Sequence, residues 1–154
     1  MGWIIFMIGA LFEALLLFPL LLYASICDIR TRQIPDYIPF SIGIVGLVHF
    51  SPFLSITGLL CTGLPYFFGA LFSGGKIGGG DIKLMAACGI VLGPFYGTLQ
   101  SILGLTLVLL FAAGIGIRSG FHVAKHTSLP LAPFLSAGGI LAYVLFRIAD
   151  SFQL

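Results

Sequence analysis

Only five of the 154 residues are acidic, and two of these acids, Asp28 and Asp81, stand where carboxylate chemistry is feasible. Asp28 follows a long apolar run and precedes an arginine-containing turn, whereas Asp81 follows a run of three glycines. Two facing carboxylates cannot easily both ionise, so one of them keeps its proton. The charged member can then take a proton from water while the protonated member polarises a carbonyl group. This pair predicts acid–base hydrolysis without a metal ion or a covalent intermediate.

A structural interpretation of the same acids has to be weighed. An aspartate directly before a helix commonly caps it by accepting backbone N–H bonds. Asp81 and Asp36 each precede a predicted helix, and Asp28 is also compatible with an ordinary juxtamembrane charge offset by Arg30. Position alone therefore leaves both interpretations open.

Residues 73–80, which end in the glycine run Gly78 to Gly80, are predicted to form a flexible loop closed by Asp81. Glycine permits positive φ angles and close backbone approach, at a cost in chain entropy. A plain linker explains the run as well as a site in which an extended substrate backbone passes close to Asp81.

The composition of the chain places these acids in a membrane protein. Hydrophobic residues make up 59% of the sequence, charged residues only 8%, and the mean hydropathy is +1.16. In a soluble domain about a quarter of the residues are charged. A helix needs about 20 mainly apolar residues to cross a bilayer. We therefore expect an all-α, polytopic membrane protein with about six transmembrane helices, forming a single domain over residues 1–154.

Six apolar runs are separated by polar, glycine-containing or proline-containing segments; they cover residues 3–26, 37–50, 54–72, 82–92, 95–117 and 129–148. Lys and Arg gather in the loops after the first, third and fifth runs. Short loops rich in Lys and Arg stay on the cytoplasmic side. We therefore expect a cell-membrane protein with both termini outside the cytoplasm, a first run that is retained rather than cleaved as a signal peptide, and Asp28 and Asp81 at the cytoplasmic face.

Two ionisable residues lie within apolar runs, Glu13 in the first and His49 in the second. Intramembrane ionisable groups are candidates for function by default, but a hydrogen-bonded packing role is favoured for both. Their distances from the predicted cytoplasmic ends put them at similar depth. We expect them to face each other or the bundle interior, and not lipid, because an unpartnered charge there is costly. A protonated Glu13 with another partner is the alternative.

Other classes of site find little support. The net charge of +2, without a basic cluster, gives no indication of nucleic-acid binding. The three cysteines are scattered and form no CxxC pair, while His122 and His126 lie in a polar segment without matching ligands and are expected to be solvated. No metal and no cofactor is expected.

Three segments resemble, in order, those of the type IV prepilin peptidases, a group of GxGD membrane aspartyl proteases. Residues 27–36 (CDIRTRQIPD) look like the family's first motif, in which an aspartate at a helix end is followed by basic residues and an Ile-Pro helix start. Residues 78–84 (GGGDIKL) resemble the GxGDxKL motif, and residues 129–134 (LPLAPF) are similar to the proline-containing opening of the last helix. Together these matches cover nearly the whole chain.

The resemblance implies that Asp28 and Asp81 are the catalytic pair of an aspartic endopeptidase. Its substrates would be prepilins, pseudopilins or preflagellins, from which it removes a short basic leader at the cytoplasmic membrane face. The motif residues implied to shape the loop or to place a cation beside the pair are Gly78, Gly80 and Lys83.

Asp36 lies eight residues after Asp28 and does not match the family's first aspartate, so it is expected to cap the helix that follows it. Larger bacterial members carry an additional cytoplasmic segment with CxxC pairs that is associated with methylating the new N-terminus. This sequence has no CxxC pair, so we expect a peptidase without N-methyltransferase activity.

Three alternatives remain open. A small transporter or channel would use Glu13, Asp28 and Asp81 along an ion path, although two of these acids are predicted at one interface. A non-catalytic subunit of a secretion or pilus assembly machine would tolerate loss of either aspartate. A presenilin-type protease also carries GxGD, but its first aspartate lies inside a helix and away from an arginine-rich turn.

Overall fold

The computed structural model describes residues 2–48, 50–73, 77–119 and 129–153. All regular elements in these ranges are helices, and no strand occurs within them. The helices, in chain order, are α1 (Gly2–Thr31), α2 (Tyr37–Val45), α3 (Pro52–Phe72), α4 (Gly79–Ser119) and α6 (Ala132–Gln153). The predicted all-α fold class is confirmed.

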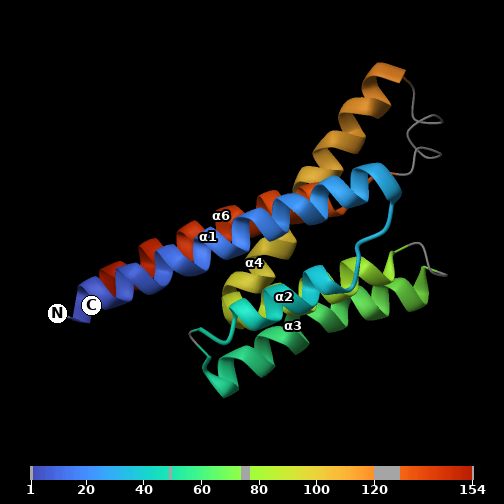
Figure 1. Ribbon diagram of the computed structural model, residues 1–154. Helices are drawn as coiled ribbons and strands as arrows, with labels where there is room; N and C mark the ends of the chain where they lie inside the picture. The colour runs from blue at the N-terminus through green and yellow to red at the C-terminus, as the bar shows by residue number, and fades with distance from the viewer. Residues whose placement is uncertain (1, 49, 74–76, 120–128, 154) are drawn as a thin grey trace.

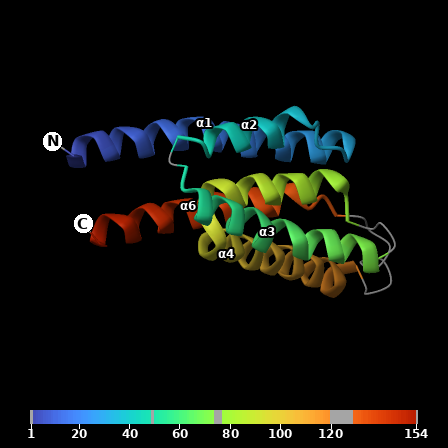
Figure 2. The same ribbon diagram turned by 90° about the horizontal axis from the view of Figure 1, so that it is seen from below.

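The helices form one bundle in which α4 contacts α2, α3 and α6, and α1 contacts α2 and α6. Figures 1 and 2 show α1 and α6 side by side and antiparallel, with both chain ends at the same end of the bundle. The opposite end contains the end of α1, the end of α3 and the beginning of α4 (Figure 1).

Helix α4 is interrupted where the sequence predicted a break. Gly93 has φ 71° and ψ −177°, and Pro94 follows it. Proline removes a helical N–H donor, and the positive φ of Gly93 is one that glycine adopts without a steric penalty. The predicted start of the segment before this break is wrong, however, because α4 begins at Gly79 and not at Ile82.

Four of the described helices, α1, α3, α4 and α6, are long and apolar enough to cross a membrane. The chain is therefore a multi-pass membrane protein. The break at Gly93 divides α4 into two helical segments. Together with α1, α2, α3 and α6, these give the six segments that the apolar runs indicate. Helix α2 has only nine residues, so six complete spans remain a prediction.

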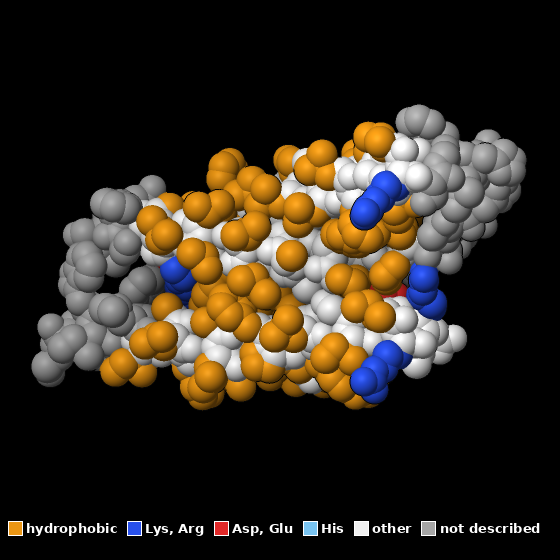
Figure 3. All heavy atoms as spheres, turned by 90° about the horizontal axis from the view of Figure 1, so that it is seen from above, with side chains coloured by type: hydrophobic (Ala, Val, Ile, Leu, Met, Phe, Trp, Pro, Cys, Tyr) orange, Lys and Arg blue, Asp and Glu red, His pale blue; other side chains and the backbone are white. Residues whose placement is uncertain are grey.

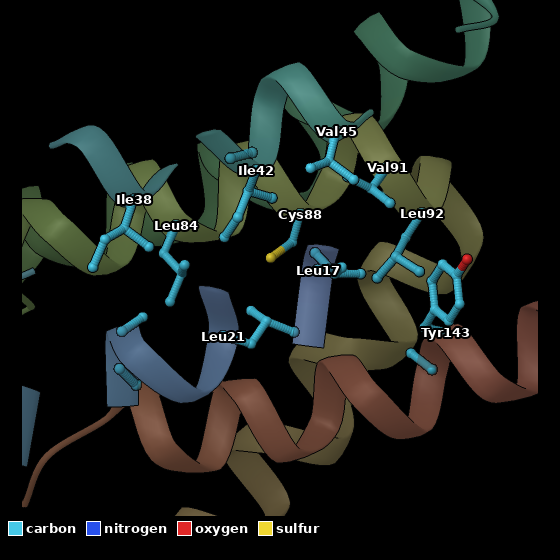
Figure 4. Packing of buried hydrophobic residues seen from close by; sticks show 14 of the residues in the cluster. Leu17, Leu21, Ile38, Ile42, Val45, Leu84, Cys88, Val91, Leu92 and Tyr143 are labelled. Atoms are coloured by element: carbon cyan, nitrogen blue, oxygen red, sulfur yellow. The ribbon is translucent and has the colours of Figure 1, made fainter. Parts of the chain in front are cut away.

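The interior joins α1, α2, α4 and α6 through buried aliphatic side chains. Figure 4 shows them pointing toward one another; they include Leu17, Leu21, Ile38, Ile42, Leu84 and Leu92. The outer surface is also apolar, as the orange side chains of Figure 3 show, with large exposed side chains such as Phe53 and Phe72. An apolar exterior suits hydrocarbon and not water.

Glycine allows α3 and α4 to approach closely. A Cβ atom added at Gly58 would lie 2.0 Å from the carbonyl oxygen of Gly89. Next to this contact, the Thr62 hydroxyl donates a hydrogen bond of 2.8 Å to the carbonyl oxygen of Met85. Small residues commonly permit such contacts between membrane helices, and here the contact holds the segment of α4 that carries Asp81.

Candidate active site

Asp28 and Asp81 line one cavity, at the end of the bundle where α1 ends and α4 begins. The cavity has a volume of about 250 Å³ and is lined by Asp28, Arg32, Gln33, Ile34, Gly78, Gly79, Gly80 and Asp81. Both aspartates are buried, with 7% of Asp28 and 8% of Asp81 exposed. The structure thus brings together two acids from different helices.

Asp28 lies in the last turn of α1, and a backbone hydrogen bond closes that turn. Arg32, the residue after the helix, has φ 56°, and its N–H donates a hydrogen bond of 3.0 Å to the carbonyl oxygen of Asp28. A left-handed residue with this bond is a common way for a helix to end. This conformation of Arg32 fixes the direction in which the chain leaves α1.

The side chain of Asp28 has a distant partner that sequence reasoning missed. Its Oδ2 accepts a hydrogen bond of 2.9 Å from the backbone N–H of Ala132, the first residue of α6. The first N–H groups of a helix have no intrahelical partner, so Asp28 caps α6 from another helix. One sequence signal was present, because the residue before Ala132 is Leu131, which has no side-chain oxygen with which to cap the helix.

Asp81 is the third residue of α4, inside the first turn and not at the N-cap position. Its Oδ1 is buried and has no hydrogen-bond partner among the described residues. The carboxyl groups of Asp28 and Asp81 line the same cavity. Because a buried polar atom without a partner is unfavourable, this oxygen is well suited to bind a water molecule or a substrate group.

The three motif glycines differ in what surrounds them. Gly79 and Gly80 belong to α4 and not to a loop, and none of the three has a positive φ. A Cβ atom at Gly80 would lie 2.9 Å from the Cβ of Ile34, and one at Gly78 would lie 3.2 Å from Oδ2 of Asp81. A Cβ at Gly79 would meet no atom of the described residues within 4 Å. Close approach is therefore the structural reason for glycine at positions 78 and 80.

Asp36 does not act as predicted. It occupies the N-cap position of α2, but its side chain makes no capping hydrogen bond. Its Oδ1 instead accepts a hydrogen bond of 2.6 Å from Nζ of Lys83 in α4. The prediction of a capping side chain is therefore wrong, and the motif lysine lies in an ion pair with Asp36.

A second buried charge cluster lies in the half of α1 away from Asp28. Glu13 is 1% exposed, as expected for a residue facing the bundle interior. It forms an ion pair with Arg147 and accepts a hydrogen bond of 3.0 Å from the Tyr143 hydroxyl, both in α6. His49, the expected partner, lies outside the described residues, as do His122 and His126.

The described residues contain no group of three or more His, Cys, Asp or Glu side chains that could hold a metal ion. Cys27, Cys61 and Cys88 are free thiols. The carboxyl groups at the cavity in this part of the chain are those of Asp28 and Asp81, and Arg32 and Gln33 are the other residues with polar side chains that line it.

Comparison with known proteins gives two matches. The model of the type IV leader peptidase family matches residues 15–118, a range that includes both cavity aspartates and the glycine run. A prepilin leader peptidase/N-methyltransferase of Bacillus subtilis (strain 168) is 32% identical over 148 residues, covering 87% of this chain and 56% of the relative. The chain thus spans just over half the length of that relative. No solved structure matches the chain.

Proposed function

The chain belongs to the type IV leader peptidase family, and from this premise we propose that it is an aspartic endopeptidase whose catalytic groups are Asp28 and Asp81. The observation that carries the proposal is the cavity shared by the two buried carboxyl groups, which come from α1 and α4. Among the described residues that line the cavity, Asp28 and Asp81 are the acidic ones.

The proposed reaction needs only these two groups and water. One carboxylate takes a proton from a water molecule, whose oxygen attacks the carbonyl carbon of the peptide bond. The protonated partner gives its proton to the carbonyl oxygen, so a neutral tetrahedral intermediate forms. When the C–N bond breaks, the carboxyl group that took the proton from water gives it to the leaving nitrogen. The other carboxylate takes a proton from a hydroxyl group of the intermediate, so acid and amine products form and the pair again shares one proton.

The proposed substrates are prepilin-like proteins, namely prepilins, pseudopilins or preflagellins, with a short basic leader before an apolar helix. The relative from Bacillus subtilis is named a prepilin leader peptidase. Arg30 lies in the last turn of α1, and Arg32 follows the helix and lines the cavity. The distribution of basic residues predicts that this end of α1 is cytoplasmic. A leader on the cytoplasmic side would therefore reach the cavity without crossing the membrane.

The proposal covers peptidase activity alone. The relative is also named an N-methyltransferase, but the CxxC pairs that accompany that activity in larger family members do not occur in this sequence. The absence of methyltransferase activity remains an expectation.

The geometry gives less support to an ion path. Glu13 precedes Asp28 by fifteen residues, which is roughly 22 Å along a helix. It is neutralised by Arg147 and lies far from the cavity. Glu13 and the two cavity aspartates therefore do not form a continuous path of acids for ions through the membrane.

Leader removal in cells tests the function. The chain is expressed in a host that lacks its own prepilin peptidase, together with prepilin-like substrates, and the substrate N-terminus is determined by mass spectrometry. We expect a shortened substrate that begins at the apolar helix. Intact leaders on every tested member of the three substrate groups, with the chain inserted in the membrane, would refute the proposal.

A further inference from the structure

The segment that joins α1 to α2, residues 32–36, forms one wall of the aspartate cavity. Three of its residues, Arg32, Gln33 and Ile34, line the cavity opposite the first turn of α4. At about 250 Å³ the cavity is smaller than typical ligand pockets of about 300–1,000 Å³. A peptide that must pass between Asp28 and Asp81 therefore requires this wall to move away from α4.

Two contacts fasten the wall to α4. Ile34 is buried and lies against Gly80, where even a methyl group would overlap it. Two residues further along the segment, Asp36 binds Nζ of Lys83 at 2.6 Å. Both contacts reach the first two turns of α4, the part of the helix that carries Asp81.

The segment starts from a helix end that a backbone hydrogen bond fixes. Arg32, where the segment begins, has a left-handed conformation with φ 56°. The bond from its N–H to the carbonyl oxygen of Asp28 accounts for this conformation, so the contacts with α4 position the rest of the segment. Among the contacts described, the ion pair is the weaker fastening, because 55% of the Lys83 side chain and 75% of the Asp36 side chain are exposed.

We propose that the Asp36–Lys83 ion pair is a latch that positions the wall formed by residues 32–36 and so sets the width of the cavity. Because the pair is exposed and weak, it opens to admit an extended peptide and closes behind it. Lys83 is then a positioning residue whose partner is Asp36, rather than a cation that sets the charge of Asp81. The identity of the peptide that enters the cavity rests on the proposed function, whereas the role of the ion pair as a latch does not.

The first test needs no substrate. The three native cysteines are replaced by alanine, and Ile34→Cys supplies the only thiol. Labelling by a water-soluble maleimide in membranes then reports how often the wall leaves α4. Asp36→Ala should raise the labelling rate about two- to fivefold, as expected for loss of one exposed ion pair. It removes no capping bond, since Asp36 makes none.

The matched control is Asp150→Ala, which removes an acid that pairs with Arg147 in α6. This variant should leave the labelling rate unchanged. Equal labelling rates for the Ile34→Cys protein that keeps Asp36 and for the same protein with Asp36→Ala would overturn the proposal.

A charge exchange separates the latch from an effect of charge on the aspartates. Asp36→Lys and Lys83→Asp should each increase labelling and slow leader cleavage, and the double variant should restore both to within about twofold of the starting values. If Lys83 acts through its charge on Asp81, the double variant stays as slow as Lys83→Asp, and the latch is refuted. Failure of the proposed function would appear differently, as no cleavage by the unsubstituted chain with the labelling pattern intact.

Discussion

The carboxylate of Asp28 accepts a hydrogen bond of 2.9 Å from the backbone N–H of Ala132, so the side chain proposed for catalysis also caps α6. This double role decides how the residue must be tested. A substitution that removes the acceptor weakens the fold and the proposed chemistry together. A substitution that keeps an acceptor but cannot titrate separates the two.

We therefore expect Asp28→Asn to have nearly the unfolding free energy of the natural chain, because the asparagine amide oxygen can accept the same bond. Asp28→Ala should lose about 1–2 kcal/mol, the usual value of a helix cap. Thermal unfolding in detergent, followed by circular dichroism, compares the two variants. Equal stability of the Ala and Asn variants would show that the bond to Ala132 contributes nothing.

Gly80 and Gly79 provide a matched pair in one turn of α4. Gly80→Ala should destabilise the protein by about 1–3 kcal/mol, because the new methyl group overlaps Ile34. The methyl group of Gly79→Ala would meet no atom of the described residues within 4 Å, so this variant should be neutral or stabilise by about 0.4–1 kcal/mol. Melting temperatures of both variants check this, and a loss of the same size at both positions would contradict the close approach to Ile34.

The cluster of Glu13, Arg147 and Tyr143 should stabilise the bundle without taking part in peptidase chemistry. Glu13→Gln leaves Arg147 partly unpaired and should cost about 1–3 kcal/mol. The double variant Glu13→Gln, Arg147→Gln should recover part of that loss, because no buried charge then remains at the pair. A double-variant cycle in melting experiments measures the coupling, and strictly additive losses would argue against an interaction between the two residues.

The proposed pair of carboxyl groups predicts the pH dependence of cleavage. Activity should fall at low pH, where both groups are protonated, and at high pH, where both are ionised. Initial rates with one prepilin-like substrate in proteoliposomes, buffered over a range of pH, give the profile. A rate that rises without a decline toward high pH would contradict an acid that must stay protonated.

The predicted topology can be tested with single cysteines. Thiols placed at Thr31 and Ser73 should react with an impermeant reagent only after the cytoplasmic side is opened, whereas a thiol at Ser51 should react in intact cells. The reason is the distribution of Lys and Arg over the connecting segments. Labelling of Thr31 and Ser51 from the same side would remove a span between them and refute the assignment.

The helices could be predicted from the sequence because hydropathy and helix breaks are local properties. Each apolar run corresponds to a described helical segment, and the break at Gly93 follows from the glycine and proline at that position. The local sequence pattern gave the wrong start for α4. The glycine run suggested a loop, yet packing against Ile34 favours a helix that already includes Gly79 and Gly80.

The partners of the charged residues could not be predicted in this way, because they depend on tertiary contacts. A capping rule considers only the neighbours of Asp36 and cannot detect Lys83 in another helix. The pairing of Glu13 with Arg147 needs the register of α1 against α6. A signal was nevertheless present for Arg147, because it is a basic residue that lies away from the three predicted cytoplasmic loops.

The most direct test of the account is leader cleavage by Asp28→Asn and Asp81→Asn, with Asp36→Asn as the matched control. Each variant is expressed with a prepilin-like substrate, and membrane insertion is confirmed by quantitative blotting. The first two variants should leave the leader uncleaved, because asparagine keeps the size of the side chain but cannot exchange a proton. Asp36→Asn should keep most of the activity, since its amide oxygen can still accept the bond from Lys83. Cleavage at close to the natural rate by an inserted Asp28→Asn or Asp81→Asn variant would contradict the account.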